Sequence, residues 1–497
     1  MSKIRKFFRD TIFYLTSNFF SNIFNLITGI AVRRLLEPAL MGLFSKIMLV
    51  FDYARYSHMG IIDALDKELP YCYGKKDYER FARLRDTGFS LCMIVAGLIV
   101  SGILAASFVV RFTDNMLFTV GLRIVALMII ARLLTSLYIV LNRAQNKFAV
   151  ISKYTILVAA LDLLFKIFLV MKFGLYGLLW ASLLTLVAGL VYFFKASEEK
   201  FGFILIFSYK EALGLLKVGF PILVMGIVFM TLTNIDRITI IRLLDNESLG
   251  FYTIALMVSA YIVQLPNLIY AVIFPRFYQA YGEKQNIFEI KELFIKPMLV
   301  FAYLFPVLIG LVILMLPLLV RYLLPAYLPG LRPAYLLLLG ASFLALVNMP
   351  NYLLIALNKQ VHIVFIGSAC ILLGGVINYM MVKSYGLGLT GVAIGTAFTY
   401  FIYATFLLVH AYRNYTKKFL SHIVFLLQLY LPFLWVVALL SLIRMISSPV
   451  PGNIYKDLAG VSCKTIFFVI GCIPLVVYVN SKTSVLTLLR QHRPRMN

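Results

Sequence analysis

Apolar segments of about 20 residues, separated by short polar connections, recur along almost the whole chain. A helix needs about 20 apolar residues to cross a hydrocarbon core about 30 Å thick, so each segment predicts a transmembrane helix. The pattern predicts an all-α, polytopic membrane protein with about 14 spans. The segments lie near residues 11–33, 42–64, 87–110, 116–141, 148–172, 174–194, 214–240, 249–275, 297–320, 332–357, 361–382, 388–411, 421–446 and 461–480.

Several short motifs occur twice in the same order. Arg34-Leu-Leu-Glu37, followed by Gly42-Leu-Phe44, returns 208 residues later as Arg242-Leu-Leu-Asp245 followed by Gly250-Phe-Tyr252. The other matches are Tyr73-Gly-Lys-Lys76 with Tyr281-Gly-Glu-Lys284, Leu141-Asn-Arg143 with Leu357-Asn-Lys359 at a shift of 216, and Gly174-Leu-Tyr-Gly177 with Gly388-Leu-Thr-Gly391 at a shift of 214. Such duplication is typical of transporters. It predicts a six-helix lobe over residues 1–205, a second over 206–415, and a C-terminal helix pair with a cytoplasmic tail over 416–497.

Composition and charge agree with a membrane protein. Of the 497 residues, 62% are hydrophobic and 13% are charged, against about a quarter charged in soluble proteins. The net charge of +25 does not indicate a nucleic-acid partner, because the basic residues are scattered singly between apolar spans. With the N-terminus inside, about 29 of the 46 Lys and Arg residues fall in cytoplasmic connections. This bias follows the positive-inside rule and predicts that both termini are cytoplasmic.

The N-terminal apolar run is predicted to be a retained first helix rather than a signal peptide. It contains Asn18, Asn22 and Asn25, lacks a clear cleavage site, and leads directly into the repeated Arg-Leu-Leu-Glu motif.

No motif indicates a catalytic, metal or cofactor site. The five cysteines and five histidines are dispersed, and no phosphate-binding loop is present. A membrane-embedded glycan polymerase or ligase is the enzyme alternative, but such enzymes usually have sizeable outer loops, which this chain lacks. The chain is therefore expected to be a transporter, with no metal and no cofactor.

Ionisable groups inside the predicted spans are concentrated in the first repeat. They are costly in a bilayer and usually face a cavity or another helix. The candidates for a shared cavity are Arg55, Arg132 and Lys166, with Asp52 and Asp162 as ion-coupling candidates. Asp52 with Arg55, and Asp162 with Lys166, share helix faces and could neutralise each other, so the alternative is that these pairs only hold helices together. Arg123 lies nearer a helix end and could reach outward, which favours Arg132 as the cavity residue.

Amide side chains form further polar stripes. Asn18, Asn22 and Asn25 lie on one face of the first predicted helix, so they would either line a hydrophilic cavity or make interhelical hydrogen bonds. In the second repeat the ionisable groups are mainly Asp236 and Arg237. Asn234, Arg237 and Gln264 complete the set of candidate substrate-binding residues.

Residues of the second repeat resemble a known family. Asn234-Ile-Asp-Arg237, Leu249-Gly-Phe-Tyr-Thr-Ile-Ala255 and Val272-Ile-Phe-Pro-Arg276, with the two Arg-Leu-Leu motifs and Phe173-Gly-Leu-Tyr-Gly177, are similar to the polysaccharide flippases. These are the O-antigen and capsule repeat-unit flippases of the multidrug/oligosaccharidyl-lipid/polysaccharide exporter superfamily. The resemblance covers about residues 10–410 and implies two six-helix lobes around a central cavity.

The resemblance also implies a function. The expected substrate is an undecaprenyl-pyrophosphate-linked oligosaccharide, moved from the inner to the outer leaflet of the cell inner membrane by alternating access. Candidate partners are a polysaccharide polymerase and other assembly proteins. A diphosphate crossing a low-dielectric interior needs nearby cations, in agreement with the bias toward the first lobe. A multidrug or cation antiporter remains open because of Asp52 and Asp162, as does a flippase for the peptidoglycan lipid precursor.

Overall fold

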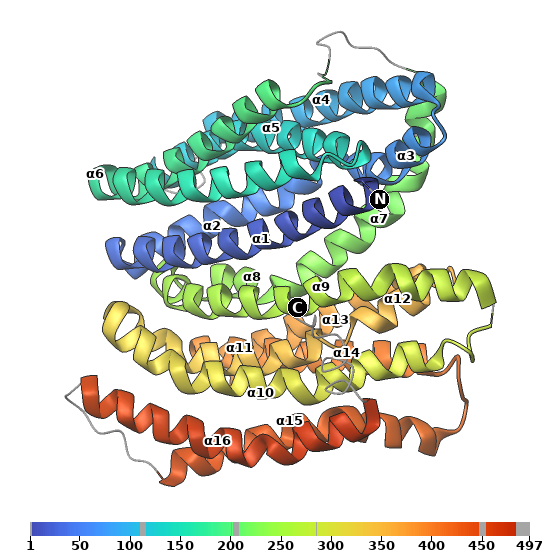
Figure 1. Cartoon of the computed structure of the whole chain (residues 1–497). Coiled ribbons are helices and arrows are strands. Elements are labelled where there is room, and N and C mark those ends of the chain that lie inside the picture. The colour runs from blue at the N-terminus through green and yellow to red at the C-terminus, as the bar shows by residue number, and fades with distance from the viewer. Residues whose placement is uncertain are drawn as a thin grey trace. The chain divides into compact units, whose positions relative to one another are not determined.

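The computed structural model describes residues 2–109, 116–199, 201, 208–284, 286–446 and 454–483. These residues form helices and short connections, and no strand occurs among them (Figure 1). Ten helical segments of this described part are long and apolar enough to cross a bilayer. The all-α, polytopic fold is as predicted, whereas the number of about 14 spans stays a prediction.

The chain forms two compact units, and the first covers Met1–Ile227. In it α1 packs along α6, and α5 packs against both α4 and α6 (Figure 1). Large apolar side chains such as Ile47, Leu65 and Phe81 are buried in this unit. Its elements are α1 (Ser2–Leu35), α2 (Pro38–Ala54), η1 (Arg55–His58), α3 (Ile61–Gly74), α4 (Tyr78–Val109), α5 (Met116–Ala144), α6 (Phe148–Ala196) and most of α7 (Tyr209–Thr233).

The second predicted span, near 42–64, is not one continuous helix. α2 ends at Ala54, η1 follows, and the backbone takes left-handed conformations at Met59 (φ 48°) and Gly60 (φ 82°) before α3 begins. A right-handed helix cannot continue through two such residues, so the segment is divided. Apolar content alone could not reveal this interruption.

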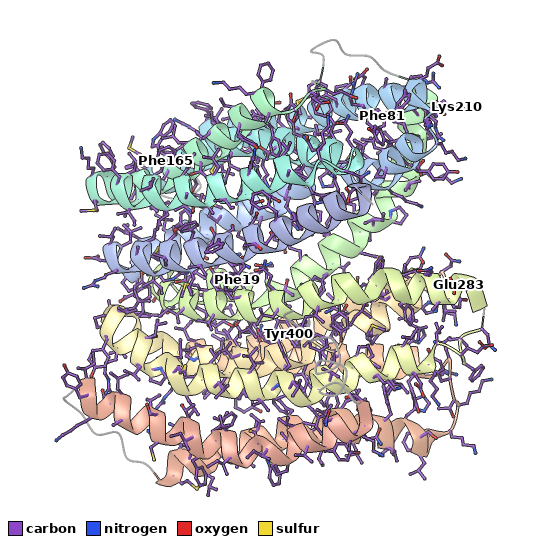
Figure 2. The ribbon with its side chains drawn as sticks, viewed as in Figure 1. Phe19, Phe81, Phe165, Lys210, Glu283 and Tyr400 are labelled. Atoms are coloured by element: carbon purple, nitrogen blue, oxygen red, sulfur yellow. The ribbon has the colours of Figure 1, made fainter. Side chains whose placement is uncertain are left out.

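The second unit covers Val228–Asn497. α11 packs against both α9 and α14, while α10 packs against α15 and α16. Tyr400 of α14 lies in the interior of this unit (Figure 2). Its elements are α8 (Ile235–Leu243), α9 (Asn246–Lys284), α10 (Lys291–Leu323), η2 (Pro325–Gly330), α11 (Leu331–Leu344), α12 (Asn348–Ala356), α13 (Gln360–Tyr379), η3 (Met380–Ser384), α14 (Gly388–Tyr412), α15 (Phe419–Ile446) and α16 (Ile454–Thr483).

At two of the repeated motifs the matched positions share a local backbone feature. The amide of Leu36 donates to the Val32 carbonyl at 2.9 Å, and 208 residues later Leu244 donates to Ile240 at the same distance. The two glycines matched at a shift of 214, Gly174 and Gly388, are both left-handed, with φ of 56° and 52°. Gly174 interrupts α6, which therefore consists of two helical segments.

One of the sequence matches has the wrong register. The turn after α5 and the turn after α12 share the same four backbone hydrogen bonds at a shift of 212 rather than 216. The left-handed residues of the two turns, Asn146 and Asn358, also correspond at 212. The turn conformation therefore pairs Asn146-Lys147 with Asn358-Lys359, and the resemblance of Leu141-Asn-Arg143 to Leu357-Asn-Lys359 does not reflect equivalent positions.

The first part of α7 packs within unit 1. The Tyr56 hydroxyl donates to the Gly226 carbonyl at 3.1 Å, and Arg80 lies 3.8 Å from Glu211. Gly60 and Gly219 bring their backbones into direct contact. The division between the compact units therefore falls within α7, between Ile227 and Val228.

Candidate functional site

Arg132 is a half-buried cation in the middle of α5. The guanidinium lies close enough to the Tyr154 hydroxyl of α6 for the two groups to interact electrostatically. In the part of the chain that the structure describes, no carboxylate pairs with the Arg132 side chain. Because an arginine keeps its charge at any relevant pH, such a position favours an anionic ligand.

Other cations of unit 1 contrast with Arg132 because they have acidic partners. Arg143, at the end of the same helix α5, lies 2.8 Å from Asp66, and Arg85 lies 2.8 Å from Glu199. Lys147 lies 2.8 Å from Glu198, and this hydrogen bond lowers the pKa of the Glu198 carboxyl. The Arg143–Asp66 pair joins α5 to α3, and the other two pairs join α4 and the turn before α6 to the connection that follows α6. These charges therefore stabilise the folded structure.

Arg55 falls near the middle of the predicted span 42–64, but in the structure it opens η1 directly after the end of α2. Its side chain is exposed, and its guanidinium lies 5.4 Å from the centre of the Tyr56 ring. Cation–π contacts of this kind at exposed sites contribute about 0.5–1 kcal/mol. The guanidinium thus remains accessible to a ligand, next to the interruption between α2 and α3.

The predicted pairing of Asp162 and Lys166 is present on α6. The Lys166 Nζ lies 2.8 Å from the Asp162 carboxylate, and both side chains are largely buried. The Asp162 carboxylate therefore neutralises much of the Lys166 charge. Asp52 lies near the end of α2, half-buried. Among the described residues no hydrogen bond or ion pair joins Arg55, Arg132 and Lys166 to one another, so a shared cavity remains a proposal.

Arg123 behaves as its position near a helix end predicts. Its guanidinium lies 4.0 Å from the centre of the Phe108 ring, and its Nε donates to the Ser107 hydroxyl at 3.4 Å. Both partners belong to the end of α4. Arg123 therefore joins the ends of two helices.

The asparagines of α1 use their amide donors within their own helix. Asn18 donates to the Tyr14 carbonyl at 2.7 Å, and Asn25 donates to the Ser21 hydroxyl at 3.4 Å. Asn22 is half-buried. Both hydrogen bonds are intrahelical, so they do not support interhelical bonding as the purpose of the stripe. The amide oxygens of these two residues accept no hydrogen bond from the described part of the chain and can serve as acceptors.

The candidates of the second repeat lie at the N-terminal end of α8 and on α9. Asn234 precedes α8, and its side-chain oxygen accepts a hydrogen bond from Arg237 Nη1 at 2.9 Å. Its amide donates to the Met230 carbonyl at 2.9 Å. These contacts stabilise the junction between α7 and α8. Gln264 is exposed on α9, and within the described residues no hydrogen bond joins it to Asn234 or Arg237.

The structure also brings together polar residues that the sequence analysis did not connect. Asp236 is fully buried, and the Tyr252 hydroxyl donates to its carboxylate at 2.9 Å. Asn378 of α13 is fully buried as well, and its amide donates to the hydroxyls of Thr239 and Thr396. Residues far apart in sequence form both groups, so no local pattern could have indicated them.

This arrangement can bind an anion more readily than perform metal chemistry. Among the described residues no group of three or more His, Cys, Asp or Glu side chains could hold a metal ion. Arg55 is exposed and Arg132 is half-buried in unit 1, and the asparagine side chains of α1 have amide oxygens, which can accept hydrogen bonds from hydroxyl groups.

Comparison with known families identifies the chain. The family described as "Polysaccharide biosynthesis protein" matches residues 31–326. The chain belongs to this family. Among curated protein sequences, none matches. The match covers α2 to α10 and therefore includes residues of both compact units.

Solved structures similar to this member of the polysaccharide biosynthesis family are transporters. The inward closed conformation of the lipid II flippase MurJ is 16% identical, with a TM-score of 0.68, and the alignment covers 93% of this chain and 98% of that chain. An inward-facing multidrug resistance MATE transporter of the MOP superfamily is 16% identical, with a TM-score of 0.65 and coverage of 86% and 96%. A MOP superfamily transporter from Pyrococcus furiosus is 16% identical, with a TM-score of 0.59 and coverage of 82% and 95%. The family member thus has the MurJ/MATE transporter fold and is a multi-pass membrane protein.

Proposed function

We propose that this member of the polysaccharide biosynthesis family is a flippase for lipid-linked oligosaccharides. Its substrate is an undecaprenyl-pyrophosphate that carries a short glycan, and it moves this substrate from the inner to the outer leaflet by alternating access. The family match supports a role in polysaccharide synthesis, and the transporter fold supports translocation.

The proposal of an anionic substrate rests on the position of Arg132. A half-buried guanidinium without a carboxylate partner among the described residues suits a permanently anionic ligand. A diphosphate provides such charge, and the planar guanidinium can donate two parallel hydrogen bonds to its oxygens. Arg55 is proposed as the second cation for the diphosphate, with Lys166 contributing less because Asp162 is its partner.

The amide residues are proposed to contact the glycan. Asn18, Asn22 and Asn25 offer acceptors for sugar hydroxyls along α1, and Asn234, Arg237 and Gln264 are the candidates of the second repeat. Asp52 and Asp162 are the candidates for ion coupling. A drug or cation antiporter of the same fold would instead select positively charged substrates, which Arg132 and Arg55 would repel.

The test is the fate of the lipid-linked oligosaccharide in a deletion strain. Complete lipid-linked repeat units are expected to accumulate on the inner leaflet, beyond the reach of a membrane-impermeant glycan-modifying reagent added to spheroplasts. Surface polysaccharide should be lost and should return when the wild-type chain is expressed. Unchanged export of complete units would contradict the proposal.

Three other outcomes identify the alternatives. An incomplete glycan on the carrier would indicate an enzyme. Altered drug or dye efflux with normal surface polysaccharide would indicate an antiporter. Accumulation of the peptidoglycan lipid precursor, with repeat units still exported, would indicate a flippase for that precursor.

A further inference from the structure

Two histidines of unit 2 stack against each other at one end of α13 and α14. The ring centres of His362, near the start of α13, and His410, near the end of α14, lie 4.7 Å apart with an angle of 28° between the planes. His362 Nδ1 lies 3.3 Å from the Lys359 carbonyl. The stack therefore joins the turn between α12 and α13 to the end of α14.

Lys359 completes this cluster. Its Nζ donates to the Asn414 side-chain oxygen at 2.6 Å, which holds the ammonium group beside the end of α14. Three basic residues lie close enough to His410 to disfavour a positive charge on its ring, namely His362, Lys359 and Arg413. We call His362, His410, Lys359 and Arg413 the basic cluster. On α10, whose start packs against Tyr415, Glu292 is already paired with Lys296 at 2.5 Å.

One ring nitrogen of the cluster has no protein partner among the described residues. His410 Nε2 is buried and has no hydrogen-bond partner in the described part of the chain. Arg413 is exposed, and Lys417 and Lys418 follow on the same connection. The backbone amides at the start of α13 add partial positive charge, because the first turn of a helix leaves its amides unsatisfied. An acceptor with several oxygens and negative charge would meet these donors.

Apolar side chains border the basic cluster on the surface of the same helices. Val361 and Phe365 of α13 are 57% and 71% exposed, and Phe406 of α14 is 57% exposed. In a membrane-spanning unit such residues face acyl chains. The basic cluster thus lies where an apolar surface ends, which is the depth of lipid headgroups, and the predicted topology places it at the cytoplasmic leaflet, where anionic lipids attract basic residues.

We propose that the basic cluster binds the phosphate group of an anionic phospholipid headgroup. His410, Lys359 and Arg413 would donate to the phosphate oxygens, and the acyl chains would lie along Val361 and Phe365. Inorganic phosphate offers the same group without acyl chains, so a comparison of the two separates a lipid site from a site for soluble phosphate. This proposal does not depend on the transported substrate.

The experiment is native mass spectrometry of the purified full chain in detergent. Phosphatidylglycerol, phosphatidylcholine and inorganic phosphate are the three probes. The wild type is expected to retain phosphatidylglycerol over phosphatidylcholine. Lys359→Met, and separately His410→Phe, which keeps an aromatic ring in the stack, should each weaken phosphatidylglycerol binding about tenfold, as expected for the loss of a hydrogen bond to a charged group.

Two further variants serve as controls. Lys383→Met removes one exposed positive charge at the opposite end of the α13 and η3 segment and should leave binding unchanged. Lys359→Arg keeps the charge and should retain most of the binding. If inorganic phosphate alone binds, and the same variants abolish that binding, the phosphate site stands and its ligand is soluble. Equal binding of phosphatidylglycerol by the wild type, Lys359→Met and His410→Phe, or equal retention of both lipids by the wild type, would overturn the proposal.

Discussion

Gly60 and Gly219 meet backbone to backbone within unit 1. A Cβ atom built on Gly219 would lie 1.9 Å from the Gly60 carbonyl oxygen, a distance that no real side chain could keep. The contact presses the first part of α7 against the interruption between α2 and α3, where Gly60 also needs its positive φ. It therefore joins two segments of unit 1 that are about 160 residues apart in the chain.

Gly219→Ala is expected to destabilise the protein by about 1–3 kcal/mol, because α7 must move away from the Gly60 backbone. Gly214→Ala on the same helix is the matched control, since nothing lies within 4 Å of the added methyl group. That control should be neutral or stabilising by up to about 1 kcal/mol. The measurement is the midpoint of thermal unfolding in detergent. Equal midpoints for the two variants would refute the packing argument.

Arg132→Ala is expected to lower export of lipid-linked oligosaccharide by about tenfold or more at normal protein abundance, because a charged contact to the diphosphate is lost. Arg132→Lys should restore part of the activity, since lysine keeps the charge without the two parallel donors. Arg143→Ala is the control on the same helix, as Arg143 pairs with Asp66 at the helix end. Surface polysaccharide and membrane abundance are the readouts. If Arg132→Ala fails to accumulate, its charge is structural; if it exports normally, Arg132 is not a substrate contact.

The Asp162–Lys166 pair separates a structural from a functional role. Lys166→Met should destabilise the protein by about 1–3 kcal/mol, less than a fully buried pair would, because both side chains keep some exposure. The double variant Lys166→Met with Asp162→Leu should regain most of that stability, because no unpaired charge remains. Transport by the stable double variant is then decisive. Normal transport by the double variant would mean that the pair has a structural role only. Loss of transport would support a role of the pair in ion coupling or substrate binding.

Tyr252→Phe is expected to lower the stability by about 1–3 kcal/mol, because the buried Asp236 carboxylate loses the hydroxyl that donates to it at 2.9 Å. Tyr209→Phe is the control, since Tyr209 is 73% exposed. Thermal unfolding of the two purified variants provides the comparison. An unchanged midpoint for Tyr252→Phe would show that the hydrogen bond contributes little.

Reporter fusions test the predicted topology. Fusions after Lys418 and after Asn497, which lies outside the described residues, should both report the cytoplasm, because basic residues gather in the connections assigned to that side. A fusion in the connection between α8 and α9 should report the opposite side. A periplasmic signal after Lys418 or Asn497 would contradict the predicted topology.

The sequence correctly predicted an all-α membrane protein. Apolar length predicts membrane helices because a bilayer demands a fixed number of apolar residues per span. The two Arg-Leu-Leu motifs, 208 residues apart, both lie at helix ends that have the same type of backbone hydrogen bond, and the duplication of the lobes stays a prediction. The Asp162–Lys166 pair was predictable as well, because residues four apart on a helix are neighbours whatever surrounds them.

Short motifs were less reliable for register. Leu-Asn-Arg and Leu-Asn-Lys match in letters at a shift of 216, yet the left-handed residues Asn146 and Asn358 correspond at 212. Only the backbone conformation of the two turns separates these alternatives, because a three-residue match in an apolar chain has little discriminating power.

The sequence by itself determined the membrane class and the helical content, since both follow from local hydrophobicity, and it predicts the duplication from motifs along one chain. Tertiary structure decided that α2 and α3 are separate, that most of α7 packs with unit 1, and that Tyr252 is the partner of Asp236. It also decided that Arg143 has an acidic partner, whereas Arg132, on the same helix, has none among the described residues. Such contacts join residues distant in sequence, and their geometry depends on how helices pack, which hydrophobic periodicity does not specify.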